Sequence, residues 1–300
     1  MSERPVVLSR GVWGVIATPF IDPNLELDRE SLSLEVAHYR EIGAAGVVAL
    51  GVFGEAERLS SDEQVAVIDT VLEEAGEMRV VVGLSAVATR PAAEQARVLA
   101  SRGEGVVGTM ALVNSDRPDQ LTAHYETIAE TTGLGVIIQD YPLQSGVHIA
   151  NSLLAETVNM CDCAVAVKSE VPPTAMAIAD LVELVNIPVF GGLGAMGLLD
   201  ELLAGSAGVM TGFSHPEGLL TTVAAFDDAG FEAAWEVWQR WLPLANFEGQ
   251  PGIGLAIRKE ILHRRGYIKE ARVRPPGKEL PLALHRMIEL HMQQLHDEVV

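Results

Sequence analysis

Lys168 is the residue of this chain whose type and setting most directly suggest chemistry. The chain contains four lysines, and Lys168 is the only one before Lys259. It follows a short apolar run, residues 164–167, whose composition is typical of a buried strand. A lysine amine is nucleophilic only when neutral, and burial in an apolar wall favours the neutral form, as in imine-forming enzymes. The alternative is a strand-end lysine whose ammonium reaches solvent.

Other positions that could take part in chemistry also follow apolar runs. Residues 51–55, Gly-Val-Phe-Gly-Glu, place two glycines three apart, so that backbone N–H groups could face a carboxylate. An ordinary turn is the alternative for this loop. Glu170 follows Lys168 by two residues, as Tyr141 follows Gln139, and side chains two apart share one face of a strand. A buried carboxylate or phenol on that face could transfer protons.

Residues 192–197, Gly-Leu-Gly-Ala-Met-Gly, match the GxGxxG pattern of dinucleotide-binding loops. That kind of site also needs an acidic residue about 20 positions further on, near the end of the next strand. Residues 209–213 contain no acid. A nicotinamide-dependent oxidoreductase is therefore disfavoured, and we expect a glycine-rich loop beside the functional site.

The elements that would position these residues alternate between apolar runs and amphipathic stretches. Eight apolar runs predict strands at 14–17, 46–50, 80–84, 105–112, 135–138, 164–167, 188–191 and 208–211. Helical patterns lie at 28–42, 61–75, 90–102, 118–132 and 151–160, and Ser60 with Glu63 resembles a helix start. Strand starts lie about 20 to 35 residues apart, which favours an α/β fold of the (β/α)₈ TIM-barrel type. Lys168 would lie at the carboxyl end of the sixth strand, where barrel enzymes carry their chemistry.

The last part of the chain has a different pattern. No strand is predicted beyond about Phe213, and helical patterns lie at 231–244, 252–265 and 280–298. A loop containing Arg274 and two prolines separates the last two. We expect residues 1–213 to form the barrel and residues 214–300 to form a C-terminal helical extension packed on it.

Composition excludes several classes of partner. The net charge of −20 disfavours nucleic acid and anionic membranes. No apolar run approaches the roughly 18 residues of a membrane span, and the first residues lack a signal-peptide core, so a cytoplasmic location is expected. Cys161 and Cys163 are too close for an easy disulfide, and no further Cys or His pair completes a zinc site. We expect no metal site.

The order and spacing of these motifs resemble those of the dihydrodipicolinate synthase and N-acetylneuraminate lyase family. Its members are class I (Schiff-base) aldolases, lyases and dehydratases on a (β/α)₈ barrel. Residues 14–20 are similar to its first strand, 51–55 to its GxxGE carboxylate-binding loop and 274–276 to its proline-bearing C-terminal loop. Gly191 and Gly192 resemble its turn after the seventh strand, and Lys168 stands where its imine-forming lysine stands. The resemblance covers nearly the whole chain.

The resemblance implies a small-molecule substrate, a 2-oxo acid such as pyruvate, that condenses with Lys168 without a cofactor. Backbone N–H groups around Phe53 and Gly54 would hold its carboxylate. The substrate-binding positions that the resemblance implies are Val52, Phe53, Gly54, Glu55, Gln139 and Gly192. The protonated imine would act as an electron sink, so that a neighbouring C–C or C–O bond can be made or broken. A homo-oligomer, a tetramer built from dimers, is also implied.

Three features depart from the pattern of the family's synthases. Gln139 stands where they carry the proton-carrying tyrosine of a YNxP motif, and glutamine cannot act as a general acid or base. Val52 and Phe53 replace two threonines of the proton relay. Gln144 replaces the arginine that holds the carboxylate of the second substrate. These departures disfavour a 4-hydroxy-tetrahydrodipicolinate synthase proper, which stays an alternative interpretation.

Residues 139–142, Gln-Asp-Tyr-Pro, resemble the branch that acts on keto-deoxy sugar acids as dehydratases or aldolases. We therefore predict a lyase that acts on a 2-oxo acid such as pyruvate or a keto-deoxy sugar acid. Lys168 is the predicted nucleophile and Tyr141 the predicted proton carrier. Other candidates for proton transfer are Glu170, Asp140, Glu55 and His215. The altered relay leaves a non-catalytic relative that binds 2-oxo acids as a further alternative.

Overall fold

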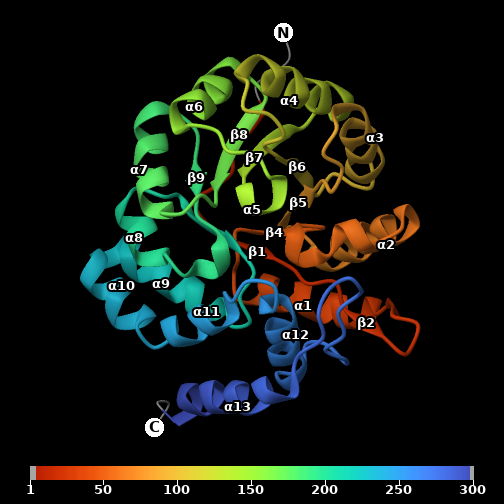
Figure 1. Ribbon diagram of the computed structural model, residues 1–300, viewed down its shortest axis with the longest axis vertical. Helices are drawn as coiled ribbons and strands as arrows, with labels where there is room; N and C mark the ends of the chain where they lie inside the picture. The colour runs from red at the N-terminus through yellow and green to blue at the C-terminus, as the bar shows by residue number, and fades with distance from the viewer. Residues whose placement is uncertain (1–4, 298–300) are drawn as a thin grey trace.

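The computed structural model describes residues 5–297 and shows a barrel of parallel strands surrounded by helices (Figure 1). The eight barrel strands are β1 (Gly11–Val15), β4 (Gly46–Ala49), β5 (Arg79–Gly83), β6 (Val106–Leu112), β7 (Gly135–Asp140), β8 (Ala164–Ser169), β9 (Val189–Phe190) and β10 (Gly208–Thr211). Each strand pairs in parallel with its neighbour in the sheet. The predicted (β/α)₈ architecture is confirmed.

The sheet closes where its last two strands meet. β1 pairs with β10 on one side and with β4 on the other. A backbone bridge joins Gly191, just after β9, to Val209 of β10, and Met210 N–H donates to the Gly191 carbonyl at 2.9 Å. Because all strands run in the same direction, the residues that follow β4, β7, β8 and β9 meet at one end of the barrel.

Side chains fill the inside of the barrel. Trp13, Val48 and Ile137 belong to the inner apolar cluster. Their strand neighbours Val47 and Ile138 face outward into the core that the strands share with the surrounding helices. The near-continuous apolar runs of the sequence therefore reflect strands that are buried on both faces.

Helices run between the strands and cover the outside of the barrel (Figure 1). They are α1 (Arg29–Glu41), α2 (Ser61–Ala75), α3 (Thr89–Ala100), α4 (Pro118–Thr132), α6 (Asn151–Met160), α7 (Thr174–Leu184), α8 (Leu198–Leu203) and α9 (Pro216–Ala229). At the start of α2, Ser60 Oγ accepts from Glu63 N–H and the Glu63 side chain accepts from Ser60 N–H. This capping box confirms the predicted helix start.

Two short features were not predicted. A small hairpin of β2 (Phe20–Ile21) and β3 (Glu26–Leu27) follows β1, and the short helix α5 (Pro142–Ser145) follows β7 almost directly. The first predicted strand is also displaced, since β1 ends at Val15 and residues 16–17 continue as buried chain without strand structure. Ile16 N–H still donates to the Val48 carbonyl at 3.2 Å, which explains why the apolar run extends past the strand.

Four helices of the described chain form the C-terminal extension: α10 (Phe231–Trp238), α11 (Leu242–Glu248), α12 (Gly254–Arg264) and α13 (Leu282–Asp297). The predicted single helix over 231–244 is wrong. Pro243 lies in the first turn of α11 and has no N–H with which to continue the hydrogen bonds of α10. In Figure 1, α13 lies at the lower edge of the molecule, outside the ring of barrel helices. Glu298, the predicted end of this helix, lies outside the described residues.

The division of the chain at residues 213 and 214 stays a prediction. α9 follows the last barrel strand and packs against both β1 and α10, so it connects the barrel to the extension. None of the helices within residues 5–297 has the combination of length and apolar character that crossing a bilayer needs.

Candidate active site

A cavity of about 430 Å³ opens at the carboxyl ends of the barrel strands. Its lining includes Lys168 of β8, Gln139 of β7 and Thr211 of β10. Val52 and Phe53, in the loop after β4, form another part of the wall. Residues 249–256, which comprise the connection after α11 and the start of α12, close one side. This volume is within the range of small-molecule sites.

Lys168, Glu170 and Gln139 form the polar centre of the cavity. Lys168 is only 5% exposed, and its Nζ lies 3.2 Å from Oε2 of Glu170. The Gln139 side-chain amide donates to the same oxygen at 2.7 Å. Gln139 and Lys168 are paired across β7 and β8, so the sheet register brings the amine, the amide and the carboxylate together.

The loop after β9 holds the other oxygen of Glu170. Leu193 N–H donates to Oε1 at 3.1 Å. Gly192 lies directly against this carboxylate, and a Cβ at that position would collide with it. Both oxygens of Glu170 therefore have fixed partners. The glycine-rich loop lies beside the site as expected, with Leu193 and Gly194 in the cavity wall.

The loop of residues 51–55 presents its first side chains to the cavity and turns the later ones away. Val52 and Phe53 line the cavity. Gly54 N–H donates to the Gly51 carbonyl at 2.8 Å, and the Gly54 carbonyl accepts from Thr18 Oγ1 at 2.6 Å. The N–H of Gly54, which the resemblance implies as a substrate donor, is thus engaged within the loop.

Glu55 is almost fully buried, and its carboxylate faces the C-terminal extension. Its Oε1 accepts from Nζ of Lys259 on α12. Its Oε2 accepts from Arg58 Nη1 at 2.7 Å and from Arg274 N–H at 3.0 Å. In this structure Glu55 anchors the loop to the extension instead of presenting its carboxylate to the cavity.

Phe53 is supported from behind by a buried arginine. The Arg258 guanidinium lies 3.7 Å from the centroid of the Phe53 ring. Its Nε donates to Oε2 of Glu248 at 3.3 Å, and Glu248 also accepts from Ser214 N–H at 3.1 Å. Burial raises the pKa of the Glu248 carboxyl, and the neighbouring Arg258 opposes this effect. These contacts fix the ring that forms one wall of the cavity.

The other candidate proton carriers lie in different settings. Tyr141 lines the cavity, and burial raises the pKa of its phenol, with a smaller contribution from Glu170. Asp140 follows Gln139 along β7 and so points to the opposite face of the strand, where it has no exposure. Burial raises the pKa of Asp140 to about 6, with a smaller contribution from Glu170. His215 packs against Trp241, with ring centroids 5.3 Å apart.

Sequence reasoning missed cavity residues that come from distant segments. Arg58 follows the 51–55 loop, Lys278 precedes α13, and residues 249–256 comprise the connection after α11 and the start of α12; all of them line the cavity. Gly249, Gly252 and Gly254 were a signal for an irregular connection at this point. Nothing in the local sequence around Lys278 indicates that it reaches the barrel mouth.

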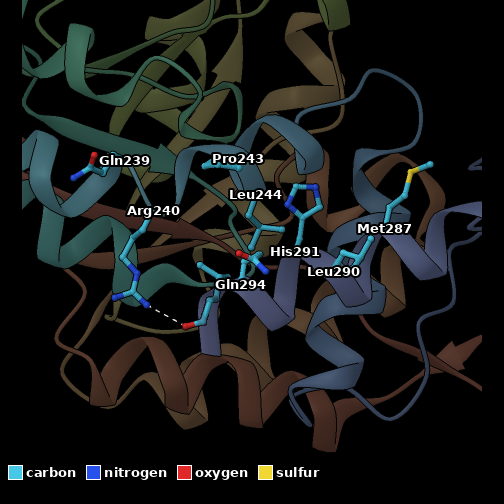
Figure 2. A pocket seen from close by; sticks show the side chains of 9 residues that line it. Gln239, Arg240, Pro243, Leu244, Met287, Leu290, His291 and Gln294 are labelled. Atoms are coloured by element: carbon cyan, nitrogen blue, oxygen red, sulfur yellow. Dashed lines mark hydrogen bonds between the residues drawn. The ribbon is translucent and has the colours of Figure 1, made fainter. Parts of the chain in front are cut away.

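A second hollow, of about 440 Å³, lies between α13 and the segment formed by the turn after α10 and the start of α11 (Figure 2). Its lining residues are Gln239, Arg240, Pro243, Leu244, Met287, Leu290, His291, Gln294 and Leu295. This lining contains no carboxylate and no lysine, so the groups suited to imine chemistry are those at the barrel mouth. Within residues 5–297, no group of three or more His, Cys, Asp or Glu side chains is placed to hold a metal ion.

Comparisons with known proteins match nearly the whole chain to one family. The model of the Dihydrodipicolinate synthetase family matches residues 8–294. The chain is 29% identical over 290 residues to the L-2-keto-3-deoxyarabonate dehydratase of Azospirillum brasilense, covering 93% of this chain and 92% of that protein. It is 28% identical over 242 residues to the 4-hydroxy-tetrahydrodipicolinate synthase of Methanothrix thermoacetophila, covering 78% and 80%.

A solved structure of the same family is similar to this chain over nearly its whole length. The crystal structure of dihydrodipicolinate synthase from Rhodopseudomonas palustris matches with a TM-score of 0.89 and 27% identity, covering 96% of this chain and 99% of that one. The similarity therefore includes both the barrel and the C-terminal helices. With a family model that matches nearly its whole length, the chain belongs to the dihydrodipicolinate synthetase family.

Proposed function

We propose that the protein is a dehydratase that removes water from a 2-oxo-3-deoxy sugar acid through an imine at Lys168. Membership of the family supports a lyase. The observation that supports dehydration most directly is the position of Glu170 Oε2, 3.2 Å from Lys168 Nζ and 2.7 Å from Gln139 Nε2. A carboxylate at that point is within reach of the carbon atoms next to an imine on Lys168. The similarity to an L-2-keto-3-deoxyarabonate dehydratase supports the same class of substrate.

The first half of the proposed reaction forms an enamine. The neutral amine of Lys168 attacks C2 of the substrate. The carbonyl oxygen takes one proton from the amine and one from solvent and leaves as water, which gives a protonated imine. Glu170 then removes a proton from C3. The electron pair of that C–H bond becomes the C2–C3 double bond, and the imine nitrogen becomes neutral.

The second half expels the hydroxyl group at C4. The nitrogen lone pair re-forms the C2–N double bond, a C3–C4 double bond forms and the C4–O bond breaks. Glu170 returns its proton to the departing oxygen, which leaves as water. Hydrolysis of the imine then releases the unsaturated 2-oxo acid and restores Lys168. One carboxylate is sufficient because it acts first as base and then as acid.

Gln139 is a positioning residue in this proposal. Its amide holds Oε2 of Glu170 but cannot itself transfer a proton. This argues against 4-hydroxy-tetrahydrodipicolinate synthesis, in which the family's synthases place a tyrosine at this position. The amide instead suits a reaction in which the neighbouring carboxylate transfers the protons.

Borohydride reduction tests the imine. The protein is incubated with pyruvate or with a five-carbon 2-oxo-3-deoxy acid, reduced, digested and mapped by mass spectrometry. We expect an adduct on Lys168, no adduct in Lys168→Ala and an unchanged adduct in Lys269→Ala, an exposed lysine. Analysis of unreduced mixtures by NMR should show loss of one water from the sugar acid.

Other outcomes would point elsewhere. An adduct that persists in Lys168→Ala, or no adduct at all, contradicts imine chemistry at this residue. Release of pyruvate and an aldehyde would indicate aldol cleavage instead of dehydration. An adduct without turnover of any substrate would favour a protein that binds 2-oxo acids without catalysis.

A further inference from the structure

The charge of the cavity lining is opposite to the charge of the whole chain. The chain carries 41 acidic and 21 basic side chains. The charged residues that line the cavity are Arg58, Lys168 and Lys278, which are basic, and Glu170 and Glu248, which are acidic. A lining with more cations than anions, in a chain of net charge −20, indicates a site for anionic ligands.

Two cations of the lining, Arg58 and Lys278, have no acidic partner within the lining. Lys168 pairs with Glu170, and Glu248 pairs with Arg258 behind Phe53. Imine formation does not change this balance, because a protonated imine carries the same charge as the ammonium that it replaces. A substrate with only its C1 carboxylate would leave part of the positive charge of Arg58 and Lys278 uncompensated. A second anionic group, at the far end of the substrate, would compensate it.

The positive charge of Arg58 is only partly compensated by its contact with Glu55. The Glu55 carboxylate is already paired with the buried Lys259, so Arg58 is the second cation on a single anion. The other acidic neighbour, Glu57, is 3.8 Å away with a side chain 53% exposed, where solvent weakens the attraction. Nε of Arg58 is buried and has no hydrogen-bond partner among the described residues.

The structure holds Arg58 close to the loop that carries Lys278. Nη1 of Arg58 lies against Gly277, where a Cβ would meet it at 2.5 Å. Arg274 fixes this loop, since its Nη1 donates to the Arg58 carbonyl at 3.0 Å and to Glu63 Oε2 at 2.8 Å. Lys278 is exposed, so it lies at the rim of the cavity, whereas Lys168 lies at its buried base.

We propose that Arg58 and Lys278 form a second anion-binding subsite, which holds a carboxylate or phosphate at the end of the substrate remote from its 2-oxo group. This inference rests on the proposed function and narrows its substrates to 2-oxo-3-deoxy sugar acids with two anionic groups. Guanidinium and ammonium groups form charge-assisted hydrogen bonds with either anion. The two cations belong to segments about 220 residues apart, so the subsite exists only in the folded chain.

Three six-carbon 2-oxo-3-deoxy acids test the subsite: one ends in a hydroxymethyl group, one in a carboxylate and one in a phosphate ester. We expect kcat/KM at low salt to be about tenfold higher for an acid with a terminal anion than for the hydroxymethyl acid. The better of the two anionic acids identifies the terminal group. Lys278→Met should clearly lower the ratio of anionic to neutral kcat/KM, whereas Lys269→Met, which changes an exposed lysine paired with Glu30, should keep the ratio.

The failure of this inference is distinguishable from failure of the proposed function. Equal kcat/KM values for the three acids, or an unchanged ratio in Lys278→Met, would overturn the subsite while dehydration of the hydroxymethyl acid still supports the function. No dehydration together with no borohydride adduct at Lys168 would overturn both. If adducts form without turnover, the same comparison is made by binding: a six-carbon sugar diacid should protect Lys168 from pyruvate trapping better than the monoacid does, and equal protection would overturn the subsite.

Discussion

Glu170 is the residue on which proton transfer in the proposed reaction depends. Its carboxylate contacts the amine of Lys168, the amide of Gln139 and the N–H of Leu193, so each of these partners presents a donor. Glu170→Gln keeps the size of the side chain and removes its ability to transfer protons. We expect kcat for dehydration to fall by about 10²- to 10⁴-fold. The rate of pyruvate adduct formation at Lys168, measured after borohydride reduction, should fall much less.

Two further variants make this prediction specific. Glu183→Gln makes the same chemical change at an exposed position of α7 and should keep the activity of the unaltered protein. Tyr141→Phe removes the hydroxyl of the proton carrier that the sequence predicts. A larger loss of kcat in Tyr141→Phe than in Glu170→Gln would show that the phenol, not the carboxylate, carries the proton.

For single residues, the sequence identifies candidates for the site better than it predicts the role of each. Lys168 could be singled out because lysine is rare in the chain and this one ends an apolar run. Glu170 was only one of several candidates, because spacing places it on the same face as Lys168 but does not show the hydrogen bonds that hold it there. Glu55 illustrates the limit, since its carboxylate is paired with Lys259, more than 200 residues further along the chain.

Among the elements, the loop after β9 packs between two carboxyl groups. A Cβ on Gly191 would collide with the carboxyl of Glu201, and a Cβ on Gly192 would collide with that of Glu170. Glu201 lies on α8 with no exposure and accepts a hydrogen bond from Thr174 Oγ1. Burial raises the pKa of Glu201 to about 7 from its ordinary value of 4.5.

The raised pKa of Glu201 predicts a pH-dependent effect on stability. Between pH 4.5 and 7 the folded protein binds more protons at this site than the unfolded chain does, so stability falls as pH rises and the penalty is complete above pH 7. Glu201→Gln removes this titration and keeps an acceptor for Thr174. Glu201→Gln should therefore be stabilised relative to the unaltered protein as pH rises. Measured in urea, the difference in free energy of unfolding, variant minus unaltered protein, should be about 2 kcal/mol larger at pH 8 than at pH 5.

The exposed Glu183→Gln variant is again the matched control, and its difference from the unaltered protein should be the same at both pH values. If Glu201→Gln also shows the same difference at pH 5 and pH 8, then Glu201 does not titrate with a raised pKa in the folded protein. Dehydratase activity of the variant at each pH shows whether the loop still positions Glu170.

Helices and strands are predicted most accurately where the local sequence carries a strong signal for their ends. The range Ser61–Ala75 was predicted to the residue because the capping box of Ser60 and Glu63 marks its start. The two-residue strands β2 and β3 have no such signal, since their pairing depends on the chain around them. The break between α10 and α11 could have been predicted from Pro243, which the amphipathic pattern obscured.

In the molecule as a whole, the barrel and the C-terminal extension share one cavity. The extension supplies residues 249–256 and Lys278 to its wall, and Lys259 of α12 reaches back to the loop after β4. Sequence patterns predict the extension as a separate group of helices, but its contribution to the site depends on packing over long sequence distances. The site is therefore complete only when both parts are folded together.

Lys259 is the residue through which this connection can be tested. It is fully buried, pairs with Glu55 and donates to the carbonyls of Thr18 at 2.7 Å and Arg272 at 2.8 Å. Lys259→Met removes the ammonium and leaves a buried carboxylate with weaker compensation, so we expect the free energy of unfolding in urea to fall by about 3 kcal/mol or more. Lys269→Met makes the same change at an exposed ion pair and should reduce it by less than about 1 kcal/mol.

The same pair of variants connects stability to function. The loop that Lys259 holds also carries Phe53, so Lys259→Met should raise KM for the 2-oxo acid under conditions in which the protein is still folded, and Lys269→Met should not. Equal losses of stability in the two variants would mean that the buried ion pair does not hold the extension to the barrel. An unchanged KM in Lys259→Met would mean that the loop keeps its position through Arg58 and Arg274, the other two partners of Glu55.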